Sequence, residues 1–153
     1  MKHIQFRPMT QEDIPDILII DQEAHQFPWS ESTLRDCIRV GYDCWVIQHR
    51  KGIAGYGIMR MTMDECHILN VCVRPAFQGK GIGRQLMNHL LQLGLGKGAV
   101  VSFLEVRASN TPAIHLYERL GYHLIERREG YYPAVDGRED AFIYRLDIPN
   151  WRP

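Results

Sequence analysis

Residues 71–84, which read VCVRPAFQGKGIGR, constrain the fold of this chain more than any other stretch. An apolar strand ends at Arg74-Pro75, and a loop with a glycine at every second position leads into a helix that is expected to begin near Gly83. Alternating glycines allow backbone N–H groups to converge, and the first turn of the helix adds unpaired N–H groups and the positive end of its dipole. The sequence therefore predicts a strand–loop–helix unit that binds an anion, most simply a pyrophosphate.

The motifs that this loop lacks narrow the choice of ligand. The dinucleotide fingerprint G-x-G-x-x-G fails, because Arg84 or Leu86 stands where the third glycine is required. A Walker loop, G-x-x-x-x-G-K-S/T, is also missing from the sequence. Lys80, Arg74 and Arg84 add positive charge that suits a phosphate-bearing cofactor. The structural alternative is a glycine-rich start of a helix without a ligand.

Composition indicates an ordinary globular protein of one domain, residues 1–153, with 45% hydrophobic residues. Because 18 Lys and Arg balance 18 Asp and Glu, no global field predicts binding to nucleic acid or to a membrane. Without an apolar span or a signal peptide, we expect a cytoplasmic protein. The 7 histidines are scattered and the 4 cysteines form no C-x-x-C pair, so we expect no metal. Cys44, Cys66 and Cys72 lie in expected strands, where we expect small, buried, reduced thiols. The cysteines are Cys37, Cys44, Cys66 and Cys72.

Hydrophobic periodicity and turn residues predict a mixed α/β fold. The expected strands are 3–7, 44–49, 53–62, 66–73, 100–106, 122–127 and 141–146, and the expected helices begin at Thr10 and cover 32–39, 83–95 and 111–120. Lys51-Gly52 is expected to turn a hairpin, and 132–137 to form a loop between the last two strands. Early hairpins and a later crossover through the helix at 83–95 predict a mixed sheet with one parallel pair.

Three segments beyond the glycine loop carry a resemblance to a known family. Together with Gln78-x-x-Gly81-x-Gly83, the run Leu104–Asn110 followed by Ala113, Tyr117 and Leu120-Gly121-Tyr122 is similar to the two halves of the acetyl-coenzyme A site of the GNAT acetyltransferase superfamily. The segments Phe27-Pro28-Trp29-Ser30 and Tyr131–Ala141 resemble the substrate-side loop and the C-terminal hairpin of its RimI-type enzymes. The likeness extends from about Ile4 to Leu146.

This resemblance implies the GNAT (acyl-CoA N-acyltransferase) fold, with a mostly antiparallel central sheet, a splayed parallel strand pair and flanking helices. It also implies acetyl-CoA as the acetyl donor, no metal, and direct transfer to the N-terminal alanine of a small-subunit ribosomal protein by a monomeric enzyme. The exact target, the breadth of specificity and any stable partner stay open. The residues that would bind acetyl-CoA are Val71, Cys72, Val73, Gln78, Gly79, Lys80, Gly81, Ile82, Gly83, Arg84 and Asn110.

Glu105 and Tyr117 are the candidate catalytic residues. Glu105 ends an apolar strand, where we expect it to be partly buried and to accept a proton from the amine, and its alternative role is an ion pair with Arg107. Tyr117 lies two helical turns after Asn110, so both project to one face, and the resemblance makes it the acid that protonates the leaving thiolate rather than a core residue. Asn110 serves equally as an N-cap. Cys72 is more plausible as packing than as a covalent nucleophile.

Aromatic side chains are the candidates for binding the peptide substrate. Phe27 and Trp29 either wall its entrance or join two helices, and Tyr131 and Tyr132 either hold its backbone or support the hairpin. The resemblance implies arginine as the second substrate residue, and the carboxylates available to it are Glu31, Asp36, Glu139 and Asp140. Two other functions remain open: acetylation of a lysine or of a small-molecule amine, and a non-catalytic sensor that binds acyl-CoA.

Overall fold

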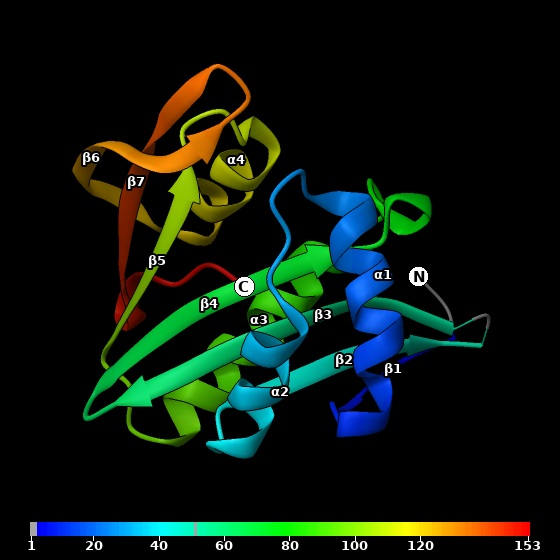
Figure 1. Cartoon of the computed structure of the whole chain (residues 1–153). Helices are drawn as coiled ribbons and strands as arrows, with labels where there is room; N and C mark the ends of the chain where they lie inside the picture. Colours follow the sequence, from blue (N-terminus) through cyan, green and yellow to red (C-terminus); the bar gives the residue numbers. More distant parts are fainter. Residues whose placement is uncertain (1–2, 51) are drawn as a thin grey trace. The chain divides into compact units, whose positions relative to one another are not determined.

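The computed structural model describes residues 3–50 and 52–153 (Figure 1). The strands are β1 (Ile4–Pro8), β2 (Asp43–His49), β3 (Gly52–Thr62), β4 (Glu65–Val73), β5 (Val101–Arg107), β6 (His123–Ala134) and β7 (Gly137–Asp147). The α-helices are α1 (Ile14–Ala24), α2 (Glu31–Arg39), α3 (Ile82–Gly96) and α4 (Thr111–Leu120). Short 3-10 helices are η1 (Gln11–Asp13), η2 (Pro75–Phe77) and η3 (Ile148–Asn150). Lys51, one of the two residues expected to turn the first hairpin, lies outside the described residues.

The 7 strands hydrogen-bond in the order β1-β2-β3-β4-β5-β7-β6. β1–β2, β2–β3, β5–β7 and β6–β7 are antiparallel pairs. β4 and β5 are parallel, with Glu65 opposite Val101 at one end of their ladder and Ile68 opposite Leu104 at the other. The predicted mixed sheet with one parallel pair is confirmed.

Contacts within the chain group it into two compact units. Unit 1 consists of residues 1–60 and 69–90, and unit 2 of residues 61–68 and 91–153. β3, β4 and α3 each have residues in both units, so the boundary runs through continuous elements. The grouping of residues 1–153 into a single domain stays a prediction.

Unit 1 has an apolar core on each face of its strands. α1 and α2 cover one face, and the first turns of α3 cover the other (Figure 1). The predicted helical spacing in α1 is confirmed, since Ile14, Ile17 and Ile20 are fully buried. On the opposite face, Gly57 admits α3 closely, because a Cβ there would lie 2.8 Å from Leu90 Cδ1.

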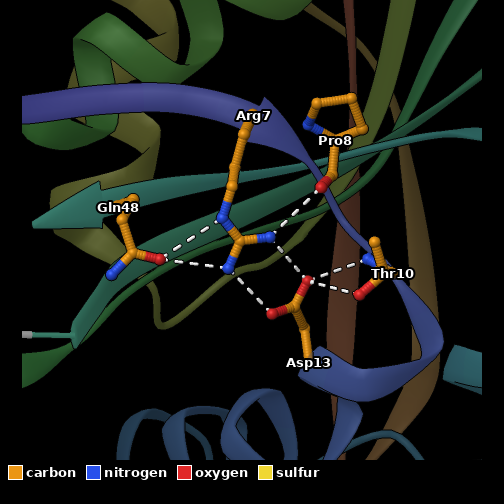
Figure 2. A network of polar contacts seen from close by, with 5 residues as sticks. All are labelled: Arg7, Pro8, Thr10, Asp13 and Gln48. Carbon is orange, nitrogen blue, oxygen red and sulfur yellow. Dashed lines mark hydrogen bonds and ion pairs between the residues drawn. The ribbon is translucent and has the colours of Figure 1, made fainter.

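A polar network joins the end of β1 to the start of α1 in unit 1. The Asp13 carboxylate accepts hydrogen bonds from both terminal nitrogens of Arg7, each at 2.8 Å, and from the backbone N–H of Thr10, also at 2.8 Å (Figure 2). Arg7 also donates to the amide oxygen of Gln48 on β2. Thr10, the expected N-cap, is the N-cap of the short helix η1, and η1 leads directly into α1.

Unit 2 contains α4 and the strands β5, β6 and β7, in which β7 pairs with both β5 and β6. α4 begins and ends as predicted, and Gly121 follows it with a left-handed φ of 112°. A Cβ at Gly121 would lie 2.6 Å from the carbonyl oxygen of Asn150, and the N–H of Arg152 donates to Leu120 O at 2.9 Å. The C-terminal segment therefore packs closely against the end of α4.

The β6–β7 hairpin is longer than predicted, because both strands extend into the expected loop at 132–137. The register shifts between Arg128 and Tyr132, and side chains satisfy the backbone there. Arg138 donates to the carbonyl oxygens of Gly130 and Tyr131, and the Asp140 carboxylate accepts from the Gly130 N–H at 2.9 Å. These bonds replace the ladder across the irregularity, so the strands continue past a glycine and a proline.

No helix in residues 3–50 or 52–153 combines the length and the apolar character that crossing a bilayer requires.

Candidate active site

The glycine loop in unit 1 has the backbone conformation that the sequence predicts. Gly79 has φ 76° and Gly81 has φ 79°, in the left-handed region that glycine adopts without steric cost. A Cβ built on either residue would meet no atom within 4 Å, so the surroundings leave open space over both. Conformation rather than packing therefore requires glycine here, and the open space fits a phosphate group that approaches the backbone.

The loop ends at the N-terminus of α3, which begins one residue earlier than predicted. Gly81 O accepts from Gln85 N–H at 3.1 Å, so Gly81 caps the helix, and the N–H groups of Ile82 and Gly83 have no carbonyl within it. Ile82 is 1% exposed and packs with Ile47 and Leu86, which anchors the first turn to the sheet. This geometry combines N–H donors with the positive end of a helix of 15 residues.

The side chains around the loop that were expected to bind the cofactor make different contacts from one another. The Gln78 amide donates to Val73 O at 3.0 Å and so ties the loop to the end of β4. The Lys80 ammonium lies 5.8 Å from the centre of the Phe77 ring. Arg74 lies 3.9 Å from the Glu23 carboxylate, so this expected phosphate-side charge is directed toward α1.

The predicted cofactor strand alternates its side chains between the two faces of unit 1. Val71 and Val73 pack with the cluster that includes Ile82, whereas Cys72 is 2% exposed and packs with the core under α1. Burial raises the pKa of the Cys72 thiol to about 12, which disfavours the thiolate that a covalent mechanism needs. All 4 cysteines are free and buried, which confirms the burial predicted for the three in strands, Cys44, Cys66 and Cys72.

Glu105 in unit 2 is the exposed position of a largely buried strand. Its side chain is 39% exposed, more open than the partial burial that the sequence suggested. Its Oε1 lies 3.3 Å from Arg128 Nη1, while Arg107 pairs with Glu139 at 2.9 Å. The carboxylate is therefore accessible to a substrate and has a cation beside it.

The turn after β5 is held by Arg107, Glu139 and Asn110. Arg107 donates to Pro133 O at 2.7 Å and stacks 4.4 Å from the centre of the Tyr132 ring, and Glu139 also accepts from the Ser109 N–H. The pKa of Glu139 is lowered, chiefly by the hydrogen bond from Arg107. Asn110 Oδ1 accepts from the Ala113 N–H at 3.3 Å, so Asn110 is the N-cap of α4.

Tyr117 is buried, and its ring meets that of Tyr122 edge to face at 5.9 Å. Burial raises the pKa of Tyr117 to about 12, and a smaller contribution comes from Tyr132. The pKa of Tyr132 is itself raised to about 12, by burial first and then by the charge of Glu105. Within unit 2, Tyr132 therefore lies within electrostatic reach of Glu105 and also of Tyr117.

The aromatic substrate candidates differ in their surroundings. Trp29 packs against the core of unit 1, which supports its role in joining helices, whereas Phe27 is 40% exposed. Tyr131 is exposed and meets Tyr132 edge to face at 5.1 Å. All four carboxylates considered for the substrate arginine pair with arginines of the chain. These pairs are Glu31–Arg35, Asp36–Arg39, Glu139–Arg107 and Asp140–Arg127.

Sequence reasoning missed a buried carboxylate at the end of α1. Asp21 is 0% exposed, and it accepts hydrogen bonds from His25 Nδ1 at 2.6 Å and from the Trp29 N–H at 2.8 Å. Asp21, His25 and Cys72 each place a potential ligand atom within 4.8 Å of the others, although the scattered histidines suggested no such cluster. The available signal was an aspartate on the apolar side of a helix with histidine four residues later.

A family model of the Acetyltransferase (GNAT) family matches residues 11–122. This chain belongs to the GNAT acetyltransferase family. It is therefore an N-acetyltransferase, and its fold and the resemblance seen in the sequence are confirmed.

Relatives of this GNAT enzyme include the ribosomal protein bS18-alanine N-acetyltransferase of Escherichia coli strain K12. The two are 40% identical over 136 residues, which cover 89% of this chain and 92% of the relative. The corresponding protein of Haemophilus ducreyi is 34% identical over 139 residues, which cover 90% of this chain and 96% of the relative.

Solved structures share the fold of this chain. The crystal structure of the ribosomal-protein-S18-alanine N-acetyltransferase from Escherichia coli has a TM-score of 0.89 at 38% identity, covering 95% of this chain and 94% of that chain. The yncA protein of Salmonella typhimurium, solved with its cofactor acetyl-CoA, has a TM-score of 0.80 at 19% identity. Its alignment covers 96% of this chain and 95% of that chain, and it supports the fold alone.

Proposed function

We propose that this enzyme transfers acetyl from acetyl-CoA to the N-terminal alanine of a small-subunit ribosomal protein. The observation that carries the proposal is 40% identity to a bS18-alanine N-acetyltransferase across nearly the full length of both chains. The left-handed glycines and the start of α3 support the pyrophosphate site. The monomeric state and the lack of nucleic-acid binding stay predictions.

Bound acetyl-CoA supplies the acetyl group and leaves as the thiol. The loop residues Gln78–Arg84 bind its pyrophosphate, and the strand Val71–Val73 offers backbone groups to its pantetheine arm and to the thioester carbonyl. Asn110 holds the arm from the start of α4. These roles place the thioester where the substrate amine can attack it.

Glu105 acts as the general base of the transfer, and Tyr117 acts as the general acid. Glu105 accepts a proton from the amine, and nitrogen then forms its bond to the acetyl carbon as the carbon–sulfur bond breaks. Tyr117 donates its hydroxyl proton to the sulfur and is reprotonated from the proton that the amine released. Because burial raises the pKa of Tyr117 to about 12, this group holds its proton throughout the physiological range.

An N-terminal amine suits this apparatus better than a lysine does. The α-amine titrates near about 7.8 and a lysine near about 10.4, so the lysine costs roughly 3.5 kcal/mol more to deprotonate. An exposed carboxylate is a modest proton acceptor, which is sufficient for an α-amine.

The test is a timed acetylation assay read by mass spectrometry. Three acceptors are offered: a peptide beginning Ala-Arg, the same peptide with a blocked N-terminus and an internal lysine, and a free small amine. Acetylation of the free N-terminus alone is expected. Modification of the lysine or of the small amine would replace the proposed substrate, and no reaction with any of the three would favour a sensor of acyl-CoA.

A further inference from the structure

Arg107, at the end of β5 in unit 2, connects two strands that do not pair with each other. β7 lies between β5 and β6 in the sheet, and Arg107 is opposite Ala141 of β7. The guanidinium reaches β6 across that strand, because its Nη1 donates to Pro133 O at 2.7 Å. Ala141 is fully buried, and its small side chain leaves room for this crossing. One arginine therefore ties the end of β5 to the far strand of the hairpin.

A carboxylate of β7 holds the guanidinium in one orientation. Arg107 Nη1 also donates to Glu139 Oε1 at 2.9 Å, and Glu139 Oε2 accepts from the Ser109 N–H at 3.3 Å. The side chains of Arg107 and Glu139 are 26% and 22% exposed, whereas those of the Arg128–Glu126 pair are 42% and 52% exposed. Solvent therefore screens the Arg107–Glu139 pair less, and Arg107 is held from both strands of the hairpin.

The face of this guanidinium packs on the ring of Tyr132. Arg107 Cζ lies 4.4 Å from the ring centre, and Tyr132 is opposite Glu139 in the β6–β7 ladder. An arginine over an aromatic face is attracted by the ring and stacks on it. The neighbouring Tyr131 meets the same ring edge to face at 5.1 Å. The plane of the Tyr132 ring is therefore set between Arg107 and Tyr131.

Tyr132 lies in the part of unit 2 that contains both candidate catalytic residues. Its pKa is raised to about 12, by burial first and then by the charge of Glu105, and Tyr132 in turn contributes to the raised pKa of Tyr117. A phenol that keeps its proton can donate a hydrogen bond to a carbonyl oxygen. Tyr131, by contrast, is 42% exposed and has Arg128 over its ring at 5.5 Å. Of the two tyrosines considered for the peptide backbone, the structure therefore favours Tyr132.

We propose that Arg107 is a positioning residue for the acceptor peptide, an inference that rests on the proposed function. Arg107 sets the plane of the Tyr132 ring, and the Tyr132 hydroxyl donates a hydrogen bond to a backbone carbonyl of the peptide near the reacting amine. Glu139 fixes Arg107 in turn. The ion pair that occupies Glu139, one of the carboxylates considered for the substrate arginine, thus has a function of its own.

This role requires a guanidinium rather than any positive charge. The Arg107 group donates hydrogen bonds at its edge and presents its face to a ring, and only a flat, delocalised cation does both at once. Lysine keeps the charge and can still pair with Glu139, but its ammonium has no face to stack on Tyr132. Arg107→Lys therefore separates the positioning of the ring from the charge.

The experiment compares Arg107→Lys with Arg127→Lys in steady-state kinetics with the Ala-Arg peptide. Arg127 is the matched control, since it also pairs with a carboxylate of β7, Asp140, and lies 5.9 Å from the centre of the Phe142 ring. We expect Arg107→Lys to raise KM for the peptide about tenfold, the scale of one lost hydrogen bond. Its kcat should stay within about threefold and its calorimetric affinity for acetyl-CoA should be unchanged, because peptide binding is what is lost. Arg127→Lys should match the wild type.

A double-mutant cycle tests whether Arg107 acts through Tyr132. Tyr132→Phe keeps the ring and removes the hydroxyl, and it is also expected to raise KM about tenfold. If the hydroxyl carries the effect of Arg107, Arg107→Lys should add less than about twofold in the Tyr132→Phe background. Independent effects, which would multiply to about 100-fold, would overturn the proposal. An unchanged KM of Arg107→Lys would do so as well.

Spectroscopy distinguishes this positioning from a general role in stability. In enzyme with ¹³C-labelled tyrosine, the ring resonances of Tyr132, assigned by their loss in Tyr132→Phe, should shift in Arg107→Lys and not in Arg127→Lys. If Arg107→Lys unfolds, Glu139→Gln weakens the same pair at constant volume and should raise KM about threefold. Resonances of Tyr132 that do not shift in Arg107→Lys, or an unchanged KM of Glu139→Gln, would contradict the proposal.

The acetylation assay separates this inference from the proposed function. If the wild type acetylates the Ala-Arg peptide and Arg107→Lys leaves KM unchanged, the function stands and the role of Arg107 falls. Acetylation of the internal lysine alone overturns the proposed substrate, while the same cycle, repeated with the lysine peptide, still decides for or against Arg107. Acetylation of the small amine alone overturns both, because that acceptor has no peptide backbone.

Discussion

Arg128 Nη1 lies 3.3 Å from Oε1 of Glu105, and this ion pair holds the candidate base at the exposed side of β5. The same guanidinium also pairs, through Nε, with Oε2 of Glu126 at 3.2 Å. Two carboxylates thus share one cation, although only Glu105 is assigned to the chemistry. The different roles of Glu105 and Glu126 can be tested directly.

Glu105→Gln is expected to lower kcat/KM for the Ala-Arg peptide about 100-fold at pH 7, because the amide cannot accept a proton. The loss should be largest at low pH, where the amine is protonated. Glu126→Gln removes the other partner of Arg128 and is expected to stay within about twofold of the wild type, since exposed ion pairs contribute little. A rate loss in Glu105→Gln that is the same at every pH would show a structural role instead.

Tyr117→Phe is expected to lower kcat about 100-fold with little change in acetyl-CoA affinity, because the ring packing is kept and the donated proton is lost. The matched control is Tyr122→Phe, which removes a buried hydrogen bond of 2.7 Å to Ser102. That control should cost about 1–2 kcal/mol of unfolding free energy and leave turnover unchanged. Steady-state kinetics and thermal unfolding of both variants measure the contrast, and full activity of Tyr117→Phe would remove its role as acid.

Gly81→Val is expected to weaken acetyl-CoA binding about tenfold or more, because a left-handed φ costs an L-residue roughly 1–2 kcal/mol and the new side chain enters the open space over the loop. Calorimetric titration measures the affinity. Gly96→Ala is the control: Gly96 ends the same helix, and its added Cβ meets no atom within 4 Å. Equal affinities in the two variants would contradict a pyrophosphate site at Gly81.

The Arg7–Asp13 pair should make stability depend on pH in the acid range. The pKa of Asp13 is lowered in the folded state, chiefly by the hydrogen bonds from Arg7. A lowered folded pKa stabilises the protein fully above the unfolded value of about 3.9, and the contribution is lost as the pH falls through the folded value. Asp13→Asn should therefore cost about 1–2 kcal/mol of unfolding free energy at pH 7 and much less near pH 2.

Denaturant unfolding of Asp13→Asn at several pH values checks this dependence. Asp36→Asn is the matched control, because its pair with Arg39 has side chains that are 60% and 68% exposed. Its effect is expected to stay within about 0.5 kcal/mol at every pH. An Asp13→Asn penalty that does not fall with the pH would exclude the ionised carboxylate as its source.

The sequence predicted those parts of the fold that depend on local pattern. Strong periodicity and clear caps located α4 from Thr111 to Leu120, and the alternating glycines located the start of α3 within one residue. The β6–β7 hairpin was predicted too short, because Pro133, Asp136 and Gly137 are residue types that are common in turns. Only the bonds from Arg138 and Asp140, which depend on the pairing itself, explain why the strands continue.

Residues of the candidate site could be predicted from the sequence where a motif contains them, but not where only tertiary packing brings them together. Glu105 and Tyr117 follow from the resemblance, but the partner of Glu105 comes from Arg128, 23 residues away on another strand. Asp21 and His25 were missed, since a helical aspartate is usually solvated and only the fold reveals its burial. The Glu105–Arg128 contact leaves no mark in local spacing, whereas the four-residue spacing of Asp21 and His25 is visible in the sequence and only the burial of Asp21 is not.

The packing of the C-terminal segment on the end of α4 has a practical consequence. Gly121 lies too close to the carbonyl oxygen of Asn150 to accept a side chain, and the Arg152 N–H donates a hydrogen bond to Leu120 O. Residues 150–152 therefore fix the end of the helix that carries Tyr117. An affinity tag fused after Pro153 would extend directly from this closely packed segment. Recombinant enzyme for the kinetic work is therefore best tagged at its other terminus.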